Sequence, residues 1–419
     1  MTEGRASLLK IDVALEIQKL TQNRFKSSTE WAVALCRHLI SQDSKLLQIN
    51  VTNGHLRLRS VGTRIEYSAL RQLSVIFDVR KPLDLRHAAI VEIEESTSFE
   101  LLCAFYLRNA AVQIMSNSQM LLVNRTRQTT LVPHAAVRPE AGSAESADSA
   151  TDIEVKSGKI KAAALKKVLC NACRHARMPV YLNGQNISEG LVLPDCFAQQ
   201  TFEVDGVQGV VGIPMNSDFV RQVTLRHGVV VKDSLKQPAF GLLYHAIADS
   251  SHEIDELQHL RSVVRTLYLK LRTQVESFQS TQRRRALEVL FGRFLETKDR
   301  KYIYGVHAFE SVEGLRFTIE QIQLLATQGP LYGIPLKLEK SHRDPLWLVC
   351  GRRVFILDAR QWNYLEKELD ITITVPPVVT ARKRLHAKTP LGKGHNTPPL
   401  KPFTPDIRLA VERIFRNMD

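Results

Sequence analysis

The chain has 419 residues, of which 44% are hydrophobic and 24% charged, and this composition is typical of a folded protein with two or three domains. No apolar run approaches the roughly 18–20 residues of a membrane-spanning helix, and the first residues lack a signal-peptide apolar core, so we expect a cytoplasmic protein without membrane contacts. The formal net charge of +14 permits binding to nucleic acid or to an acidic partner without demonstrating either.

The six cysteines lie in apolar contexts, which predicts reduced thiols rather than disulfides. Cys170 and Cys173 form a Cys-x-x-Cys pair, but a structural zinc site needs four ligands, and neither a second such pair nor a His-x3-5-His partner is present. The two thiols stand at i and i+3 of a predicted helix over 162–176, so we expect both to pack in the core and predict no metal site.

The first predicted elements are two helices and a hairpin. Residues 8–26 form an amphipathic pattern that would cover one edge of the first domain. A half-buried helix with apolar positions from Trp31 to Ile40 follows, and a Ser or Thr just before Glu30 would cap it. Alternation from Leu46 to Arg59 across Asn53-Gly54 then predicts two antiparallel strands.

This helix and hairpin resemble the nucleotide site of the GHKL ATPase superfamily, which includes gyrase, HtpG-type chaperones, histidine kinases and MutL. In that family a helix with Glu-x-x-x-Asn-x-x-Asp precedes a hairpin that ends in Asp-x-Gly-x-Gly. The resemblance places Ala34 at the general-base Glu, His38 at the magnesium-binding Asn and Ser41 at the Asp. It also makes the hairpin end a remnant of the nucleotide pocket, with Ser60, Gly62 and Thr63.

These replacements remove the groups that the family's reaction uses. Hydrolysis needs a carboxylate to orient water and an oxygen ligand for magnesium, and Ala34 and His38 supply neither. Replacing the adenine-reading Asp by Ser60 would cost about 1.5–3 kcal/mol of binding. The predicted lid, residues 93–100, has three acids and no glycine, so it would repel a polyphosphate. We therefore expect no bound cofactor.

The following elements complete a first domain over 1–195. The segment 99–116 is similar to the family's lid-following helix and the strand after it, and two more strands are predicted at 120–125 and 129–132. Residues 134–152 are rich in Ala, Ser and acid, which predicts a flexible insertion. The helix over 162–176 and a hairpin with Asn183-Gly184 at its turn close the domain.

Three further regions follow. Residues 196–290 predict strands and a covering helix over 254–278, similar to the transducer domain of MutL and the chaperone, with Arg283 to Arg285 on a solvated helix face. Residues 291–375 alternate as a third α/β unit without a recognised family. Residues 376–419 form a basic, Pro-rich tail and a last amphipathic helix over 406–418. The expected fold class is α+β: a Bergerat-type two-layer α/β sandwich, a transducer-like α/β domain and a third small α/β unit.

The expected function is that of a non-catalytic pseudo-ATPase, an HtpG/MutL-like interaction or assembly protein with a protein partner. One alternative is a divergent, chaperone-like ATPase that binds ATP and magnesium. Another is a nucleic-acid-binding accessory protein whose tail supplies the contacts, with Arg382, Lys383, Arg384 and Lys388. The sequence contains no P-loop and no Gly-x-Ser-x-Gly or His-Glu-x-x-His motif, so it offers no support for other hydrolase chemistry.

Overall fold

The computed structural model describes residues 28–94, 96, 98–107, 109–133, 149–251, 260–336 and 353–375. The predicted helix over 8–26, the strand expected at 346–349 and the whole tail lie outside these ranges. The chain divides into two compact units, Met1–Pro238 with Leu243–Leu267, and Ala239–Leu242 with Tyr268–Asp419. Both units combine sheets with helices, which confirms the predicted α+β class.

The first unit contains an eight-stranded sheet in the order β5-β4-β3-β6-β2-β1-β7-β8. All neighbouring strands are antiparallel except β1 and β7, which are parallel. The predicted hairpin is confirmed, because β1 and β2 pair from Leu46↔Val61 to Thr52↔His55. The strands are β1 (Leu46–Thr52), β2 (His55–Val61), β3 (Ala111–Ser116), β4 (Gln119–Val123), β5 (Thr129–Pro133), β6 (Ala150–Lys156), β7 (Val180–Leu182) and β8 (Gln185–Asn186).

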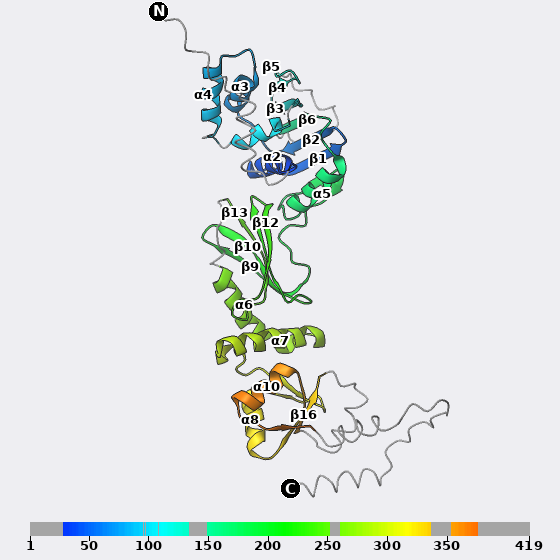
Figure 1. Ribbon diagram of the computed structural model, residues 1–419, viewed down its shortest axis with the longest axis vertical. Helices are drawn as coiled ribbons and strands as arrows, with labels where there is room; N and C mark the ends of the chain where they lie inside the picture. The colour runs from blue at the N-terminus through cyan, green and yellow to red at the C-terminus, as the bar shows by residue number, and fades with distance from the viewer. Residues whose placement is uncertain are drawn as a thin grey trace, which may run out of the picture. The chain divides into compact units, whose positions relative to one another are not determined.

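Helices cover one face of this sheet (Figure 1). Along β1, Leu47, Ile49 and Val51 are buried while Gln48 and Asn50 are exposed, as expected when only one face meets a helical layer. The predicted two-layer α/β sandwich is thus confirmed. The helical layer comprises α2 (Glu30–Ser41), α3 (Tyr67–Phe77), α4 (Leu83–Glu94), the 3-10 helix η1 (Phe99–Phe105) and α5 (Ala162–Cys173).

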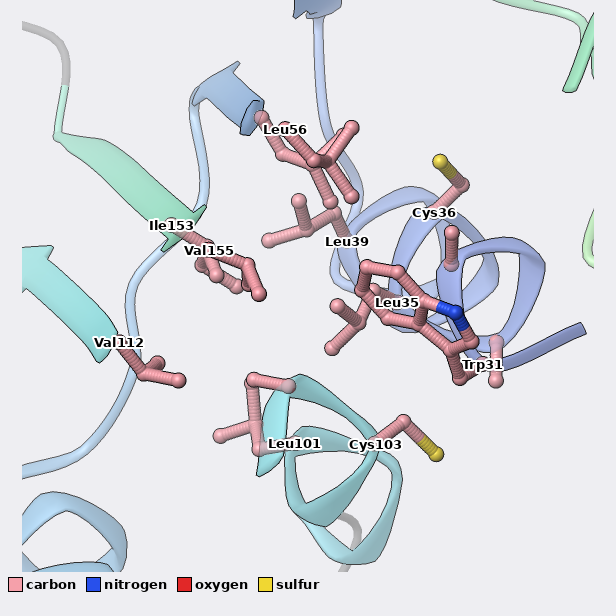
Figure 2. Packing of buried hydrophobic residues seen from close by; sticks show 14 of the residues in the cluster. Trp31, Leu35, Cys36, Leu39, Leu56, Leu101, Cys103, Val112, Ile153 and Val155 are labelled. Carbon is pink, nitrogen blue, oxygen red and sulfur yellow. The ribbon is translucent and has the colours of Figure 1, made fainter. Parts of the chain in front are cut away.

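Helix α2 is the centre of the core. Figure 2 shows Trp31, Leu35 and Leu39 packed between strand residues and η1. Most of the helix is buried, so the prediction of a half-buried helix is wrong: η1, α5 and β1 all contact it, and a helix enclosed on several sides needs apolar residues all round. The predicted side-chain cap is also absent at Thr29, the residue before α2, because its hydroxyl accepts no hydrogen bond from the backbone N–H groups of the first turn.

Strand β6 corrects the predicted insertion over 134–152. Residues 134–148 lie outside the described ranges, but Ala150 to Asp152 begin a strand that is paired on both sides, with β2 and β3. Thr151 is fully buried, and Asp152 accepts hydrogen bonds from Arg57 at 2.5–3.1 Å. A segment of small and polar residues such as Ala150 to Asp152 can therefore form a strand when its polar groups are hydrogen-bonded, so this composition does not indicate a loop alone.

The two Asn-Gly turns do more than reverse the chain. Asn53 accepts a hydrogen bond from the Ala162 backbone N–H at 3.0 Å and so caps α5, whose own preceding residue supplies no cap. Asn183 has a positive φ of 50° and Gly184 one of 85°, which is the type I′ geometry expected of a two-residue hairpin. The Asn183 side chain also bonds the Val51 backbone, accepting from its N–H at 2.8 Å and donating to its C=O at 3.0 Å.

Asp78, at the end of α3, gives this domain a pH-dependent contribution to stability. Its buried carboxylate accepts hydrogen bonds from the Arg80 guanidinium at 2.9 Å, and this pairing lowers the pKa of Asp78 to about 2. Because the folded pKa lies below the unfolded value of about 3.9, the stabilisation is complete above pH 4 and is lost as the pH falls through 2. Arg80 is largely exposed, and solvent screening limits the gain to about 1–2 kcal/mol.

We expect Asp78→Asn to lower the free energy of unfolding by this amount at pH 7, and the difference from the native protein to shrink below pH 4. Urea unfolding between pH 7 and pH 3 measures it. The control is Glu203→Gln, which changes an exposed acid and should stay within about 0.5 kcal/mol at every pH. A difference that is the same at pH 7 and pH 3 would contradict the assignment.

The first unit also contains a five-stranded sheet in the order β12-β11-β13-β10-β9. All pairs are antiparallel except β11 and β13. Helix α6 (Leu260–Gln274) follows, and the division between the compact units falls within it, inside the region 196–290 that the sequence treats as one domain. The strands are β9 (Cys196–Val204), β10 (Val207–Pro214), β11 (Val220–Arg226), β12 (Val229–Lys236) and β13 (His245–Ser250).

The second unit contains a sheet in the order β15-β14-β17-β16-β18, so the predicted third α/β unit is confirmed. On its longest described helix Arg283 is 5% exposed and donates to the His307 backbone C=O at 2.7 Å, so the prediction of a solvated arginine face is wrong at this position. The elements are η2 (Val275–Ser277), α7 (Ser280–Thr297), η3 (Arg300–Tyr302), β14 (Phe309–Ser311), β15 (Arg316–Phe317), α8 (Ile319–Thr327), β16 (Leu331–Pro335), β17 (Val354–Leu357), α10 (Ala359–Glu368) and β18 (Ile373–Thr374).

None of the helices in the part of the chain that the structure describes combines the length and the apolar character that crossing a membrane requires.

Candidate functional site

Four of the six positions that the resemblance assigns to the nucleotide site are packed inside the protein, whereas Ser41 and Gly62 are partly exposed. Ala34 is 2% exposed, His38 3%, Ser60 0% and Thr63 1%. Sites for small molecules are clefts or cavities of roughly 300–1,000 Å³. Side chains with almost no accessible surface do not line such a space, so a nucleotide could reach these four residues only after core side chains moved.

Protein groups also bind several polar atoms of the hairpin end, although the buried Thr63 Oγ1 has no hydrogen-bond partner among the described residues. The Ser60 hydroxyl lies 2.6 Å from the Ser44 hydroxyl, and the Thr63 backbone C=O accepts from the Thr151 hydroxyl at 3.2 Å. Gly62 has a φ of 90°, and its N–H donates to the Ser149 C=O at 2.7 Å. The segment is thus held by neighbouring strands, as in a structural turn.

One acid of the predicted lid has a structural partner. Glu100 accepts from the Arg37 guanidinium at 2.7–2.8 Å, which ties η1 to α2. The side chains are 19% and 24% exposed, so the pair is partly shielded from solvent. This carboxylate therefore anchors the helical layer, a role that the sequence analysis did not foresee.

The Cys-x-x-Cys pair is divided between core and surface. Cys173 is buried, as expected, but Cys170 is exposed, so the prediction that both thiols pack in the core is wrong for Cys170. A hydrogen bond with Cys173, together with burial, raises the pKa of the Cys36 thiol well above its usual value. Within the described ranges no group of three His, Cys, Asp or Glu side chains could hold a metal ion.

An open cavity of about 460 Å³ lies beside the buried hairpin end, and we call it the Arg177 cavity. It is bordered by the end of α2 and the residues after it, by the turns after β9 and β11, and by the end of β13. Of the predicted site residues, Ser41 is among those that line it. The lining residues are Ile40, Ser41, Asp43, Ser44, Arg177, Met178, Gly206, Gln208, His227, Gly228, Asp249, Ser250 and Ser251.

An ion pair orders the wall of the Arg177 cavity. The Arg177 Nη2 lies 2.8 Å from Asp249 Oδ2, and the Gly228 N–H donates to Asp249 Oδ1 at 3.0 Å. The Asp249 side chain is 6% exposed and that of Arg177 is 41% exposed. Burial, reinforced by the positive charge of Arg226, lowers the pKa of His227, so this imidazole is neutral at pH 7.

Sequence reasoning missed this cavity because its residues come from five separate segments that share no local motif. In the structure the Asp205-Gly206 and His227-Gly228 turns connect β9 to β10 and β11 to β12. The basic tail residues Arg382, Lys383, Arg384 and Lys388 lie outside the described residues, so their predicted contacts stay predictions.

No protein-family model matches the chain, and no curated protein matches it. Among solved structures, the chain is similar to the B subunit of DNA gyrase from Myxococcus xanthus, with a TM-score of 0.36 and 10% sequence identity. The alignment covers 57% of this chain and 86% of the gyrase chain. A likeness at this level carries no argument about what the chain binds.

Proposed function

We propose that this protein is a non-catalytic relative of the GHKL ATPases, with an HtpG/MutL-like arrangement of domains, and that it serves as an interaction or assembly component. The observation that carries the proposal is the near-complete burial of Ala34, His38, Ser60 and Thr63. An ATPase needs an open pocket, a carboxylate beside the attacking water and oxygen ligands for magnesium. The residues at the corresponding positions support a structural role.

Exposed apolar side chains on α3 and α4 support the interaction part of the proposal. Helix α4 buries Ala89, Ile90 and Ile93, yet Leu85 and Val91 on the same helix are 52% and 45% exposed. The same region exposes Tyr67, Val79 and Leu83 at 55%, 52% and 42%. Apolar surface of this kind on a folded protein is characteristic of contacts with other proteins.

We expect the purified protein to show no magnesium-dependent ATP hydrolysis above background, because the positions that would orient water and bind magnesium are apolar or buried. Phosphate release is the first measurement. Thermal melting with and without ATP and magnesium is the second, since a ligand at about 100 times its Kd would stabilise the fold by about 2.7 kcal/mol.

The control for contaminating ATPases is the His38→Gln variant. Residual phosphate release that is equal in the native protein and in the folded variant comes from another protein. Turnover that the variant loses, or a melting shift with ATP that it loses, would contradict the proposal and favour a divergent ATPase.

A further inference from the structure

We propose that the Arg177 cavity is a binding site for a small organic molecule that carries one phosphate or carboxylate group, and that Arg177 binds this group. The site shares Ser41 with the positions assigned to ATP chemistry but is not lined by Ala34, His38, Ser60 or Thr63, and the proposal does not depend on whether the protein hydrolyses ATP. Four observations support it: the fixed guanidinium, the distribution of charge, the neutral polar lining and the size.

The guanidinium of Arg177 is held in place but still has free donors. Its Nη2 bonds the buried carboxylate of Asp249, and the Gly228 N–H fixes that carboxylate from another direction. A guanidinium has five N–H donors, so the contact with Asp249 leaves most of them for a ligand. Because the partner is buried and the Arg177 side chain is 41% exposed, the ion pair orients a positive group toward the open space.

The charges of the lining favour a single anionic group. Arg177 is the one Lys or Arg among the described residues that line the cavity. Asp249 is already paired, and Asp43 is exposed, so water screens its charge. His227 adds no charge at pH 7, since its pKa is lowered by burial.

Neutral polar groups supply the remaining contacts. Gln208 on β10 is exposed and borders the cavity, and Ser41 and Ser251 border it from other elements. The Ser41 hydroxyl donates to the His38 backbone C=O at 2.8 Å, so toward a ligand it can only accept. Gly206 and Gly228 have φ values of 75° and 76°, so these turns bring backbone to the rim without a side chain. A small molecule with hydroxyl or amide groups beside its anionic group fits this lining.

The volume of about 460 Å³ is too large for an inorganic ion alone and lies within the range of organic ligands, roughly 300–1,000 Å³. The ligand therefore has a body that fills the space beside its anionic group.

The test is calorimetric titration of the full chain with phenyl phosphate and with benzoate, and with phenol as the uncharged probe. We expect one of the anions to bind and phenol to bind at least tenfold more weakly. The comparison of phenyl phosphate with benzoate shows whether the group is a phosphate or a carboxylate. Loss of a charge-assisted hydrogen bond predicts that Arg177→Met weakens the binding roughly 10-fold to 100-fold.

Two further variants keep the test decisive if Arg177→Met folds poorly. Gln208→Trp fills the cavity from an exposed position and leaves Arg177 and Asp249 in place, so it should abolish binding. Arg174→Met is the matched control, because Arg174 pairs with Glu189 at 2.7 Å outside the cavity, and it should leave the affinity unchanged. Failure of the native protein to bind either anion, or binding that survives Gln208→Trp, would overturn the proposal.

Discussion

The Ser60→Asp variant, which introduces the acid that the GHKL pattern has at the corresponding position, is expected to destabilise the protein by about 3–5 kcal/mol at pH 7. Ser60 is 0% exposed, and its hydroxyl contacts the Ser44 hydroxyl at 2.6 Å. A carboxylate there would lose its hydration and would have no cation among its described partners. In a nucleotide pocket the same substitution would place the acid against solvent or ligand, where it would cost little.

The pH dependence identifies the cause of this destabilisation. Burial raises the pKa of the introduced carboxyl above its unfolded value of about 3.9, so the folded state binds the proton more tightly. The penalty is therefore complete above the raised pKa and shrinks as the pH falls toward 4. Urea unfolding at pH 7 and at pH 4.5 measures the difference.

Two controls separate charge from the loss of a contact. Ser60→Ala removes the hydrogen bond with Ser44 and should cost about 1 kcal/mol. Gln48→Asp places the same acid on the exposed face of the neighbouring strand and should stay within about 0.5 kcal/mol. Equal stability of Ser60→Asp and Gln48→Asp would show that position 60 is open to water and would support the hypothesis of a nucleotide pocket there.

The Asn183→Ala variant is expected to lower the free energy of unfolding by about 2–4 kcal/mol. Asn183 combines a left-handed backbone with two side-chain hydrogen bonds to the Val51 backbone, and Val51 is fully buried. Alanine disfavours the left-handed conformation by about 1 kcal/mol or more, and it leaves the Val51 N–H and C=O without these partners. The Asn183 side-chain amide extends the hydrogen bonding between the parallel strands β1 and β7 by one residue. Its loss therefore also weakens the pairing at this end of the two strands.

Asn183→Gly separates the two contributions. Glycine keeps the left-handed backbone but not the amide, so about 1–3 kcal/mol of the loss should remain. Asn117→Ala, at an exposed turn residue with a φ of 53°, should show the backbone contribution alone. Urea unfolding of the three variants tests how the loss of stability divides between the backbone conformation and the side-chain amide. An Asn183→Gly variant as stable as the native protein would contradict the role of the amide.

The architecture was largely predictable because local periodicity reports which face of an element is buried. Alternation around Asn53-Gly54 and Asn183-Gly184 identified both hairpins, and the α+β class followed from the order of the elements. Where several elements surround one helix, the local pattern is not enough: α2 was expected to be half-buried, yet its environment is set by η1, α5 and β1 together. The whole of β6 was missed, since its first residues were assigned to a flexible insertion and Thr151 and Asp152 acquire their partners only from strands distant in sequence.

The candidate site was less predictable than the fold. The family pattern drew attention to Ala34, His38 and Ser60, and the structure buries all three. The Arg177 cavity depends on how turns and strand ends meet in three dimensions, and no spacing in the sequence records that meeting. Of the predicted positions, Ser41 connects the two, since it stands in the family pattern and also borders the cavity.

The place of β6 in the sheet has a consequence for how the protein is made. Ile153 of β6 pairs with Leu58 of β2 on one side and with Ile114 of β3 on the other. During synthesis, β2 and β3 therefore each have one unpaired edge until β6 has been translated. At elongation rates of about 5–20 residues per second, the β2 edge waits about 5–20 s for its neighbour. Nascent chains of this protein therefore carry two open strand edges while the residues between β2 and β6 are synthesised, and in this period aggregation competes with folding and chaperones are most needed.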